Sequence, residues 1–365
     1  MNIINYVKKF GNLSFEEKEF NEIDSLILCE LSYCRFEYFI PSIFSNEPYK
    51  TMTNIIKKEA NINVLIKSTL VPKKNKKLID ALKSKKRFKD IKLGEYWSVF
   101  DEKSENQFFA LTFFLPNGSM YICFRGTDIT LLGWREDFNM SFLKTNLCQK
   151  ESEEYTKYIL KKYPDRMFYL GGHSKGGNLA FYIALRLKKE HLPYLLMSYS
   201  HDGPGFIDVV KSTFAFYIEE IKDKLNKTVP YNSIVGFLLD GYKYSSVVKA
   251  SSFSIFQHDP FNWQIDKEGQ FIYLTQRSSL SIKKEKAMDE WLSSLNMLQR
   301  QFLTNFIFSS LGGNDLTVKQ ISKYSLRIIK TFIKNYKILD EENKVLIKSS
   351  INKLIEFYKD FVFKK

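Results

Sequence analysis

The spacing of apolar residues changes several times along the chain. Two dense apolar runs, "QFFALTFFLP" from Gln107 and "SMYICFRG" from Ser119, flank Asn117-Gly118. Alternating apolar runs joined by Asn-Gly are typical of a tight hairpin between two strands. The next short apolar run, Met167 to Leu170, is followed by apolar residues at helical spacing. This part of the chain therefore predicts a hairpin, then a buried strand that leads into a helix.

Similar patterns extend over the rest of the sequence. Helical spacing is found in 20–39, 52–92 and 151–162, and strand-like runs in 195–200, 228–239 and 246–260. Strands that alternate with helices predict an α/β protein with a mostly parallel sheet covered on both faces. From about residue 283 the pattern is helical: Ile321, Tyr324, Ile328 and Phe332 share one face, and Thr317 with Gln320 fits a capping box. We expect an α/β domain over 1–282 with an N-terminal helical segment, and a helical appendage over 283–365 packed on it.

Composition predicts a globular protein without a membrane-spanning helix. The chain has 365 residues, 44% of them hydrophobic, which is enough for one large core. No apolar stretch is long enough for a transmembrane helix, and the N-terminus lacks the apolar core of a signal peptide. We therefore expect a cytoplasmic protein. The four cysteines have no metal-binding spacing, so we expect reduced, buried thiols.

The net charge is +14, and part of it is concentrated in one segment. The stretch "KKNKKLIDALKSKKRFKDIK", Lys73 to Lys92, is densely basic. One interpretation is a weak attraction to anionic membranes. The other is the solvated face of a helix that buries Leu78, Ile79 and Leu82, which the pattern favours. No nucleic acid is expected as a partner.

A G-x-S-x-G motif lies where the buried strand meets its helix. In "GGHSKGG", Gly172 and Gly176 stand two residues on either side of Ser174. Small residues are needed there because strand and helix crowd together, and the tight turn pushes the serine out of the sheet. This strand–turn–helix frame predicts the nucleophile elbow of an α/β-hydrolase, with Ser174 as nucleophile.

A serine nucleophile needs a general base. His173 is adjacent to Ser174 and directed away from it, His191 lies in a polar loop, and His201 precedes most acid candidates. His258, in "FSIFQHDPFNW", follows the last strand-like run, where the histidine of this fold is found. We therefore expect His258 to be the base.

The base in turn needs an acid, and the sequence leaves two candidates. Asp202 directly follows the strand after the nucleophile helix, and Asp240 follows the next strand-like run. We expect Asp202 to be the acid, with Gly203 and Gly205 letting its loop turn sharply, and keep Asp240 as the alternative. The oxyanion donors expected are the backbone N–H of Lys175 and Thr127 in "CFRGTD", although Arg125 there is also compatible with a plain turn and an ion pair to Asp137.

Several motifs together resemble a known family. "CFRGTD", "GWREDF" and "GGHSKGGNLA" resemble the lipase class 3 superfamily and, more narrowly, a bacterial family of lipase-related α/β-hydrolases whose biological role is not settled. The resemblance implies an α/β-hydrolase fold, Ser174 as nucleophile, His258 as base and Thr127 at the oxyanion hole. Class 3 lipases carry the acid in an Asp-x-Val-Pro motif, and the matching position here is Ser233.

These features predict a serine hydrolase of the esterase/lipase type that cleaves a carboxylic ester through an acyl-serine, with a small-molecule or lipid ester as substrate. No metal or organic cofactor is expected. The alternative is a catalytically weak hydrolase-fold protein that binds a lipid or protein partner, favoured by the serine at position 233.

Overall fold

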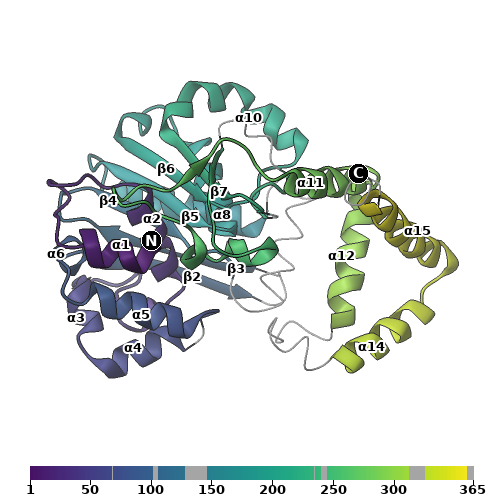
Figure 1. Cartoon of the computed structure of the whole chain (residues 1–365), viewed down its shortest axis with the longest axis horizontal. Helices are drawn as coiled ribbons and strands as arrows, with labels where there is room; N and C mark the ends of the chain where they lie inside the picture. The colour runs from purple at the N-terminus through teal and green to yellow at the C-terminus, as the bar shows by residue number, and fades with distance from the viewer. Residues whose placement is uncertain are drawn as a thin grey trace.

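The computed structural model describes residues 1–67, 69–101, 106–127, 146–233, 235–239, 245–311 and 325–359. In this part of the chain the strands form a nine-stranded sheet whose spatial order is the chain order (Figure 1). The strands are β1 Lys50–Thr51, β2 Lys92–Asp101, β3 Asn106–Phe114, β4 Met120–Phe124, β5 Phe168–His173, β6 Leu195–His201, β7 Leu225–Pro230, β8 Ser246–Val248 and β9 Tyr273–Leu274.

The helices flank this sheet and extend beyond it. They are α1 Ile3–Phe10, α2 Glu22–Ser32, α3 Met52–Ile56, α4 Glu59–Ile66, α5 Pro72–Leu82, α6 Lys86–Lys89, α8 Leu147–Lys162, α9 Lys175–Ala184, α10 Asp208–Ile221, α11 Ser279–Ser293, α12 Met297–Leu311, α14 Ser325–Lys337 and α15 Glu341–Tyr358. Short 3-10 turns lie at η1 Phe36–Tyr38, η2 Leu192–Tyr194, η3 Lys222–Lys224, η4 Ser254–His258 and η5 Pro260–Asn262.

Strand direction divides the sheet into a parallel centre and antiparallel edges. Strands β4 to β8 run parallel, whereas β1 to β4 and the pair β8–β9 are antiparallel. The predicted hairpin is confirmed: β3 and β4 pair antiparallel, and Gly118 takes the left-handed conformation with φ 88°. The helices α8, α9 and α10 connect successive parallel strands, and right-handed crossovers in one direction place such helices on one face.

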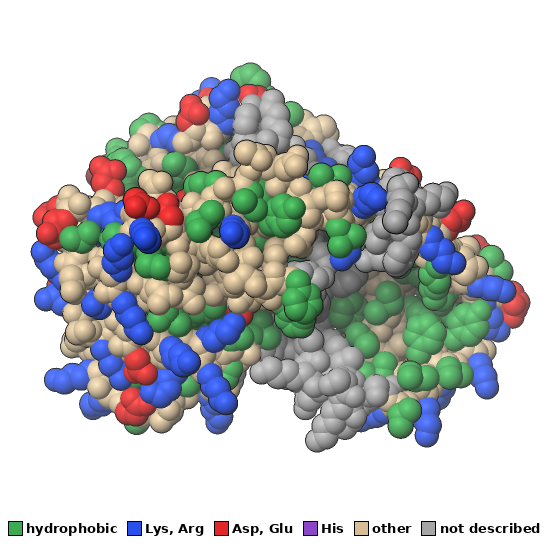
Figure 2. All heavy atoms as spheres, in the orientation of Figure 1, with side chains coloured by type: hydrophobic (Ala, Val, Ile, Leu, Met, Phe, Trp, Pro, Cys, Tyr) green, Lys and Arg blue, Asp and Glu red, His purple; other side chains and the backbone are tan. Residues whose placement is uncertain are grey.

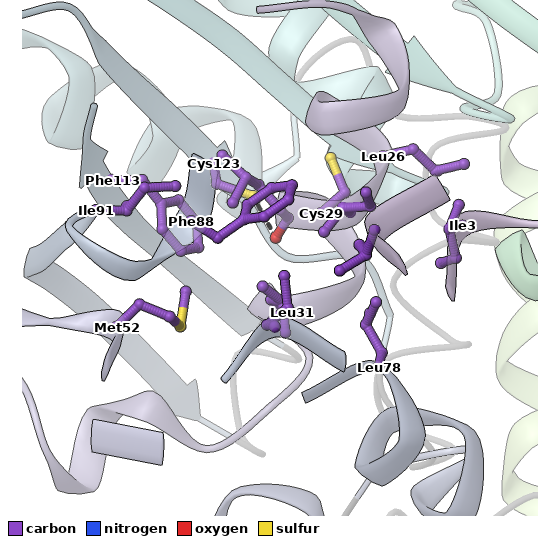
Figure 3. Close-up of a cluster of buried hydrophobic side chains, with 14 of the residues drawn as sticks. Ile3, Leu26, Cys29, Leu31, Met52, Leu78, Phe88, Ile91, Phe113 and Cys123 are labelled. Atoms are coloured by element: carbon purple, nitrogen blue, oxygen red, sulfur yellow. Dashed lines mark hydrogen bonds between the residues drawn. The ribbon is translucent and has the colours of Figure 1, made fainter. Parts of the chain in front are cut away.

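Alternate residues of each strand serve two separate hydrophobic clusters. On β4, Ile122 and Phe124 pack with α8 and α9, whereas Tyr121 and Cys123 pack with the N-terminal helices on the opposite face. Figure 3 shows the second cluster, in which Leu26 and other side chains from α2, α5 and α6 meet the sheet. Both faces are therefore covered, as expected for a parallel sheet, and the protein has the predicted α/β-hydrolase fold.

Three predicted segments differ in the structure. The helical stretch over 52–92 ends at Lys89, and Lys92 begins β2. The strand-like run over 228–239 is strand only as far as Pro230, and Phe237, although buried, lies in a turn. Of the run 246–260 only Ser246–Val248 is strand. A short apolar run marks burial but does not distinguish a strand from a buried turn.

The C-terminal helices have a small core of their own. Phe306 of α12 packs edge-on against Phe332 of α14, with ring centroids 5.0 Å apart, and Trp291 Nε1 of α11 donates to the Ser350 carbonyl of α15 at 2.9 Å. Helix α11 begins at Ser279, slightly before the predicted boundary at 283. Of the predicted apolar face, Ile328 and Phe332 lie on α14, while Ile321, Tyr324, Thr317 and Gln320 fall outside the described residues.

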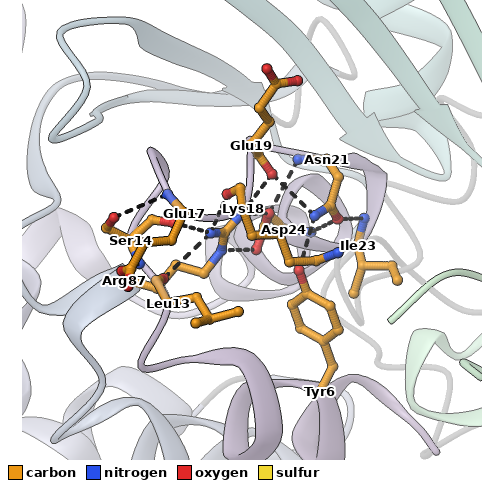
Figure 4. Close-up of polar contacts among 10 residues, drawn as sticks. All are labelled: Tyr6, Leu13, Ser14, Glu17, Lys18, Glu19, Asn21, Ile23, Asp24 and Arg87. Atoms are coloured by element: carbon orange, nitrogen blue, oxygen red, sulfur yellow. Dashed lines mark hydrogen bonds and ion pairs between the residues drawn. The ribbon is translucent and has the colours of Figure 1, made fainter. Parts of the chain in front are cut away.

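Part of the basic stretch Lys73–Lys92 is paired with carboxylates. As the pattern favoured, α5 buries Leu78, Ile79 and Leu82. Arg87 points inward: its guanidinium donates to the Asp24 carboxylate, with Nε to Oδ1 at 2.8 Å, and to nearby carbonyls (Figure 4). Ion pairs also join Lys74–Asp259, Lys76–Glu59, Lys76–Asp80, Lys83–Glu59, Lys83–Asp80 and Lys86–Glu17.

None of the helices in the described ranges combines the length and apolar character needed to cross a bilayer.

Candidate active site

Ser174 occupies a strained turn between β5 and α9. Its φ of 59° and ψ of −130° lie outside the regions that non-glycine residues ordinarily adopt. A Cβ on Gly172 would lie 2.1 Å from the Gly176 backbone, and one on Gly176 would lie 2.1 Å from the Phe124 carbonyl oxygen. Both glycines are therefore required by close backbone approach, which is the physical basis of the predicted motif.

The turn places Ser174 at the carboxyl ends of the central parallel strands. The Ser174 backbone N–H donates to the His201 carbonyl at the end of β6, at 2.9 Å. Helix α9 begins at Lys175, so its amino end lies beside Ser174. In open parallel sheets, sites form at the carboxyl edge, and a helix amino terminus there favours negative charge.

Asp202 and His258 meet at the same edge. Asp202 directly follows β6, its side chain is fully buried, and its Oδ2 accepts a hydrogen bond from His258 Nδ1 at 2.6 Å. His258 ends the 3-10 turn η4 and keeps a quarter of its side chain exposed. The other ring nitrogen, Nε2, is thus left for chemistry at the surface of the site.

Ser233 occupies the position at which class 3 lipases carry their acid. Its hydroxyl donates to Asp202 Oδ1 at 2.5 Å, and it accepts from the Gly236 N–H at 2.9 Å. A Cβ on Gly236 would lie 2.2 Å from Asp202 Oδ1, so only glycine leaves room for the carboxylate there. Asp202 therefore has partners on both oxygens. The alternative acid, Asp240, lies outside the described residues.

The turn after β6 is made differently from the prediction. Asp202 itself is left-handed, with φ 51°, whereas Gly203 and Gly205 are absent from the positive-φ residues of the described chain. Aspartate tolerates this conformation better than most residues. Gly203 has a different role: a Cβ there would lie 2.8 Å from the Asn178 backbone nitrogen. It allows the loop to pack against the first turn of α9.

His173 connects the nucleophile strand to the His258 loop. Its Nε2 donates to the His258 carbonyl oxygen at 2.9 Å, and its Nδ1 accepts from the Tyr33 hydroxyl at 3.0 Å. The two imidazole rings lie 4.4 Å apart. Burial, together with the neighbouring His258, holds the pKa of His173 well below its ordinary value, so this ring stays neutral.

The sequence gives no signal for the contact between His173 and His258, because spacing indicates only that His173 is directed away from Ser174. In the described part of the chain, no hydrogen bond joins Ser174 Oγ to His258. Such bonds are often long in ligand-free enzymes and shorten when substrate binds.

Of the two expected oxyanion donors, Lys175 directly follows Ser174, and Thr127 directly follows Gly126. A Cβ on Gly126 would lie 3.2 Å from Ser174 Cβ, so the loop that contains Thr127 packs directly on the nucleophile. Lys175 is buried, and its ammonium donates to the Gln107 carbonyl at 2.8 Å. This contact fixes the side chain away from the backbone N–H that is expected to bind the oxyanion.

Arg125, on the same loop, is held by the N-terminal segment. Its Nη2 pairs with Glu37 Oε2 at 3.1 Å, and its guanidinium lies 3.4 Å from the centre of the Phe109 ring. The partner suggested by the sequence, Asp137, and the "GWREDF" motif fall outside the described residues. The arginine anchors the start of the loop, whose Gly126 packs against Ser174.

A serine–histidine hydrogen bond lies in the interior, between α2 and the end of β6. Ser25 Oγ of α2 and His201 Nε2 are 2.9 Å apart, and His201 Nδ1 lies 2.7 Å from the Thr228 hydroxyl. Both Ser25 and His201 are fully buried, so substrate cannot reach them. Burial lowers the pKa of His201 to about 3. We interpret this network as a tie between α2 and the sheet.

Two exposed aromatic side chains lie on the segment before His258. Phe253 and Phe256 are 71% and 59% exposed, and their ring centroids are 5.6 Å apart.

A surface depression lined by Asn117, Tyr163 and Met167 lies at the amino ends of β4 and β5, the opposite ends of these strands from Ser174. It is therefore remote from Ser174.

Comparison with known protein families places the chain in one of them. The model of a family described as Mbeg1-like matches residues 82–309, which include Ser174, Asp202 and His258. The chain belongs to the Mbeg1-like family. The match covers the sheet from β2 onward together with α11 and most of α12. A comparison with curated protein sequences finds no match.

Solved structures to which this chain has some similarity include lipases. A Rhizomucor miehei lipase–propeptide complex is 15% identical with a TM-score of 0.39, covering 65% of this chain and 75% of its own. Lipase II from Rhizopus niveus is 13% identical with a TM-score of 0.36, covering 69% and 82%. A Rhizopus microsporus var. chinensis lipase is 12% identical with a TM-score of 0.32, covering 65% and 80%. The fold assignment of the Mbeg1-like protein rests on its own sheet and elbow.

Proposed function

We propose that this Mbeg1-like protein is a serine hydrolase of the esterase/lipase type, with Ser174 as nucleophile, His258 as general base and Asp202 as the acid. The observation that carries the proposal is the bond between His258 Nδ1 and the buried Asp202 carboxylate, at the sheet edge where Ser174 takes the strained elbow conformation. A structural histidine would not need a buried acid on one nitrogen and a quarter-exposed ring.

In the proposed reaction, His258 Nε2 removes the proton from Ser174 Oγ as the oxygen attacks the ester carbonyl carbon. Asp202 accepts from Nδ1–H and stabilises the imidazolium that forms. The backbone N–H of Lys175 and the donors of Thr127 stabilise the tetrahedral oxyanion. Collapse of this intermediate breaks the bond to the alcohol, which leaves with the proton from His258.

The acyl group is then bound to Ser174 as an ester. Water attacks its carbonyl carbon, and His258 takes the water proton and returns it to Ser174 Oγ. The products are a carboxylic acid and an alcohol, and the enzyme returns to its starting protonation state. The residues named are sufficient for both half-reactions without a cofactor.

A lipid-like ester is the substrate class we favour. Phe253 and Phe256 offer exposed aromatic surface on the segment that ends at His258. Apolar surface beside a polar reaction centre favours an acyl chain over a charged group. The Ser233–Asp202 hydrogen bond also weakens the main argument for a catalytically inactive binding protein, because an acid is available although position 233 is a serine.

The test is ester hydrolysis by the wild type and by Ser174→Ala, with p-nitrophenyl esters of increasing acyl length. We expect turnover that depends on Ser174 and is greater for longer acyl chains than for acetate. The proposal would be contradicted if both proteins released p-nitrophenol at the same rate, or if the wild type released none from any ester of the series.

A further inference from the structure

Helix α14, Ser325–Lys337, has two faces of different character. Its inner face carries Phe332, which packs on Phe306 of α12, and Asn335, which donates to the Ser310 hydroxyl at 3.2 Å. Its outer face is not covered by this packing. Leu326 is 75% exposed, Ile329 54% and Ile333 48%.

The exposed apolar residues of α14 form a stripe beside a row of basic residues. At about 100° per residue, Leu326, Ile329 and Ile333 fall within an arc of about 60°. Arg327, Lys330, Lys334 and Lys337 occupy the next arc of about 80° by the same geometry. The sequence of the helix, "SLRIIKTFIKNYK", contains four basic residues and no acidic residue.

The basic row on α14 differs from the basic stretch on α5 and α6. In α5, Lys76 and Lys83 each pair with Glu59 and Asp80. On α14, in contrast, no carboxylate of the described chain forms an ion pair with any of the four basic side chains. Figure 2 shows hydrophobic and basic side chains gathered together over the C-terminal helices. The positive charge of α14 is therefore available to an external anionic partner.

We propose that the outer face of α14 docks the protein onto an anionic lipid bilayer. An exposed apolar stripe next to unpaired basic side chains fits the plane of a bilayer interface, where apolar residues enter the acyl boundary and basic residues meet lipid phosphates. Aligned positive charge complements the negative surface of such a membrane, and the exposed leucine and isoleucines add the apolar contact that a soluble acidic polymer lacks. The proposal does not depend on esterase activity, because binding is measured without substrate.

The test uses the full chain and vesicles of phosphatidylcholine, with or without phosphatidylglycerol, in co-sedimentation at low and physiological salt. We expect binding to the anionic vesicles that decreases with salt. Each basic residue near such a surface contributes about 1 kcal/mol. The variant Lys330→Glu/Lys334→Glu should therefore bind at least about tenfold more weakly.

A matched control tests whether the effect belongs to α14 or to net charge. Lys73 and Lys77 on α5 are also exposed, so Lys73→Glu/Lys77→Glu makes the same change of charge elsewhere. The control should bind within about twofold of the wild type, and Leu326→Gln/Ile329→Gln should weaken binding without changing net charge. Circular dichroism confirms that each variant is folded. Equal loss in control and α14 variants, or wild-type binding by folded α14 variants, would overturn the proposal.

Discussion

His258 Nδ1 lies 2.6 Å from Asp202 Oδ2, and Asp202 follows β6, the strand that pairs with β5 before Ser174. The position that holds the acid in class 3 lipases holds Ser233, whose hydroxyl binds the other oxygen of the same carboxylate. The carboxylate thus comes from the neighbouring strand end, and the serine at position 233 helps to hold it. The chain therefore has a carboxylate next to His258 although it lacks the Asp-x-Val-Pro motif.

Replacing the acid should nearly abolish turnover while the fold remains. Asp202→Asn keeps the shape of the side chain but removes the charge that holds the histidine tautomer and stabilises the imidazolium. The same change in the triad of a serine protease lowers kcat by about 10⁴-fold, and we expect a loss of that order here. Steady-state hydrolysis of the best p-nitrophenyl ester measures it, with thermal melting as the folding control.

Ser233→Ala and Asp240→Asn are the matched controls for the acid. Ser233→Ala removes one hydrogen bond from the carboxylate, worth about 1 kcal/mol, so a loss of about fivefold is expected. Asp240→Asn should leave turnover unchanged. A large loss in Asp240→Asn with an active Asp202→Asn would reverse the assignment.

His173 is expected to act as a positioning residue. His173→Phe keeps a ring against His258 but loses the hydrogen bonds to the His258 carbonyl and to Tyr33. Two lost bonds of about 1 kcal/mol each predict a fall in kcat of roughly tenfold to thirtyfold, with little change in KM.

The rate–pH profile separates positioning from catalysis. Because burial holds the pKa of His173 well below its ordinary value, His173 does not titrate in the working range and should not produce the acidic limb. The limb should therefore persist in His173→Phe and activity should still fall as pH decreases. A profile that loses its acidic limb in His173→Phe would identify His173 as the base instead.

The sequence was sufficient for the elements whose chemistry is local. The elbow could be predicted because Gly172 and Gly176 have no room for a Cβ. The Asn117-Gly118 turn could be predicted for a different reason, because Gly118 takes a positive φ of 88° that glycine adopts readily. Contacts between distant segments could not be read from spacing. The link between Tyr33 and His258 through His173 is one example. The left-handed backbone of Asp202 was not predicted either, because the glycines that follow it were expected to make the turn.

The partners of the basic segment could not be predicted from the sequence either. Composition identifies Lys73–Lys92 as positively charged, but its partners come from distant parts of the chain: Asp259 binds Lys74, and Asp24 binds Arg87. The apolar pattern correctly predicted a helix that buries Leu78, Ile79 and Leu82, but the charge pattern gave no indication that Arg87 is buried.

Breaking the buried ion pair on one side should destabilise the fold strongly. Arg87 and Asp24 have fully buried side chains, so Arg87→Met leaves the Asp24 carboxylate without its counter-ion. We expect a loss of about 3–5 kcal/mol in the free energy of unfolding, measured by urea denaturation. The double variant Arg87→Met/Asp24→Asn should recover part of it, whereas a double variant less stable than Arg87→Met would contradict this account.

His201 should make the fold sensitive to acid. Its pKa is lowered by burial to about 3, whereas an unfolded histidine binds a proton below about pH 6.5. Between these values the unfolded chain holds one more proton, so stability is complete above pH 6.5 and is lost as pH falls toward 3, by up to about 1.4 kcal/mol per pH unit.

The variant His201→Gln removes this titration. Its free energy of unfolding at neutral pH should be lower, because the contacts with Ser25 and Thr228 change, but its decrease from pH 7 to pH 5 should be smaller than in the wild type. Urea midpoints at the two pH values measure both slopes. Equal slopes would show that His201 does not contribute.

The central claim is that Ser174 is an activated nucleophile, and covalent labelling tests it most directly. A fluorophosphonate probe is added to the wild type, to Ser174→Ala and to His258→Ala, and the labelled peptide is identified by mass spectrometry. We predict a single adduct on Ser174 in the wild type, none in Ser174→Ala and strongly slowed labelling in His258→Ala. Wild-type protein that stays unlabelled, or an adduct that persists in Ser174→Ala, would contradict the account.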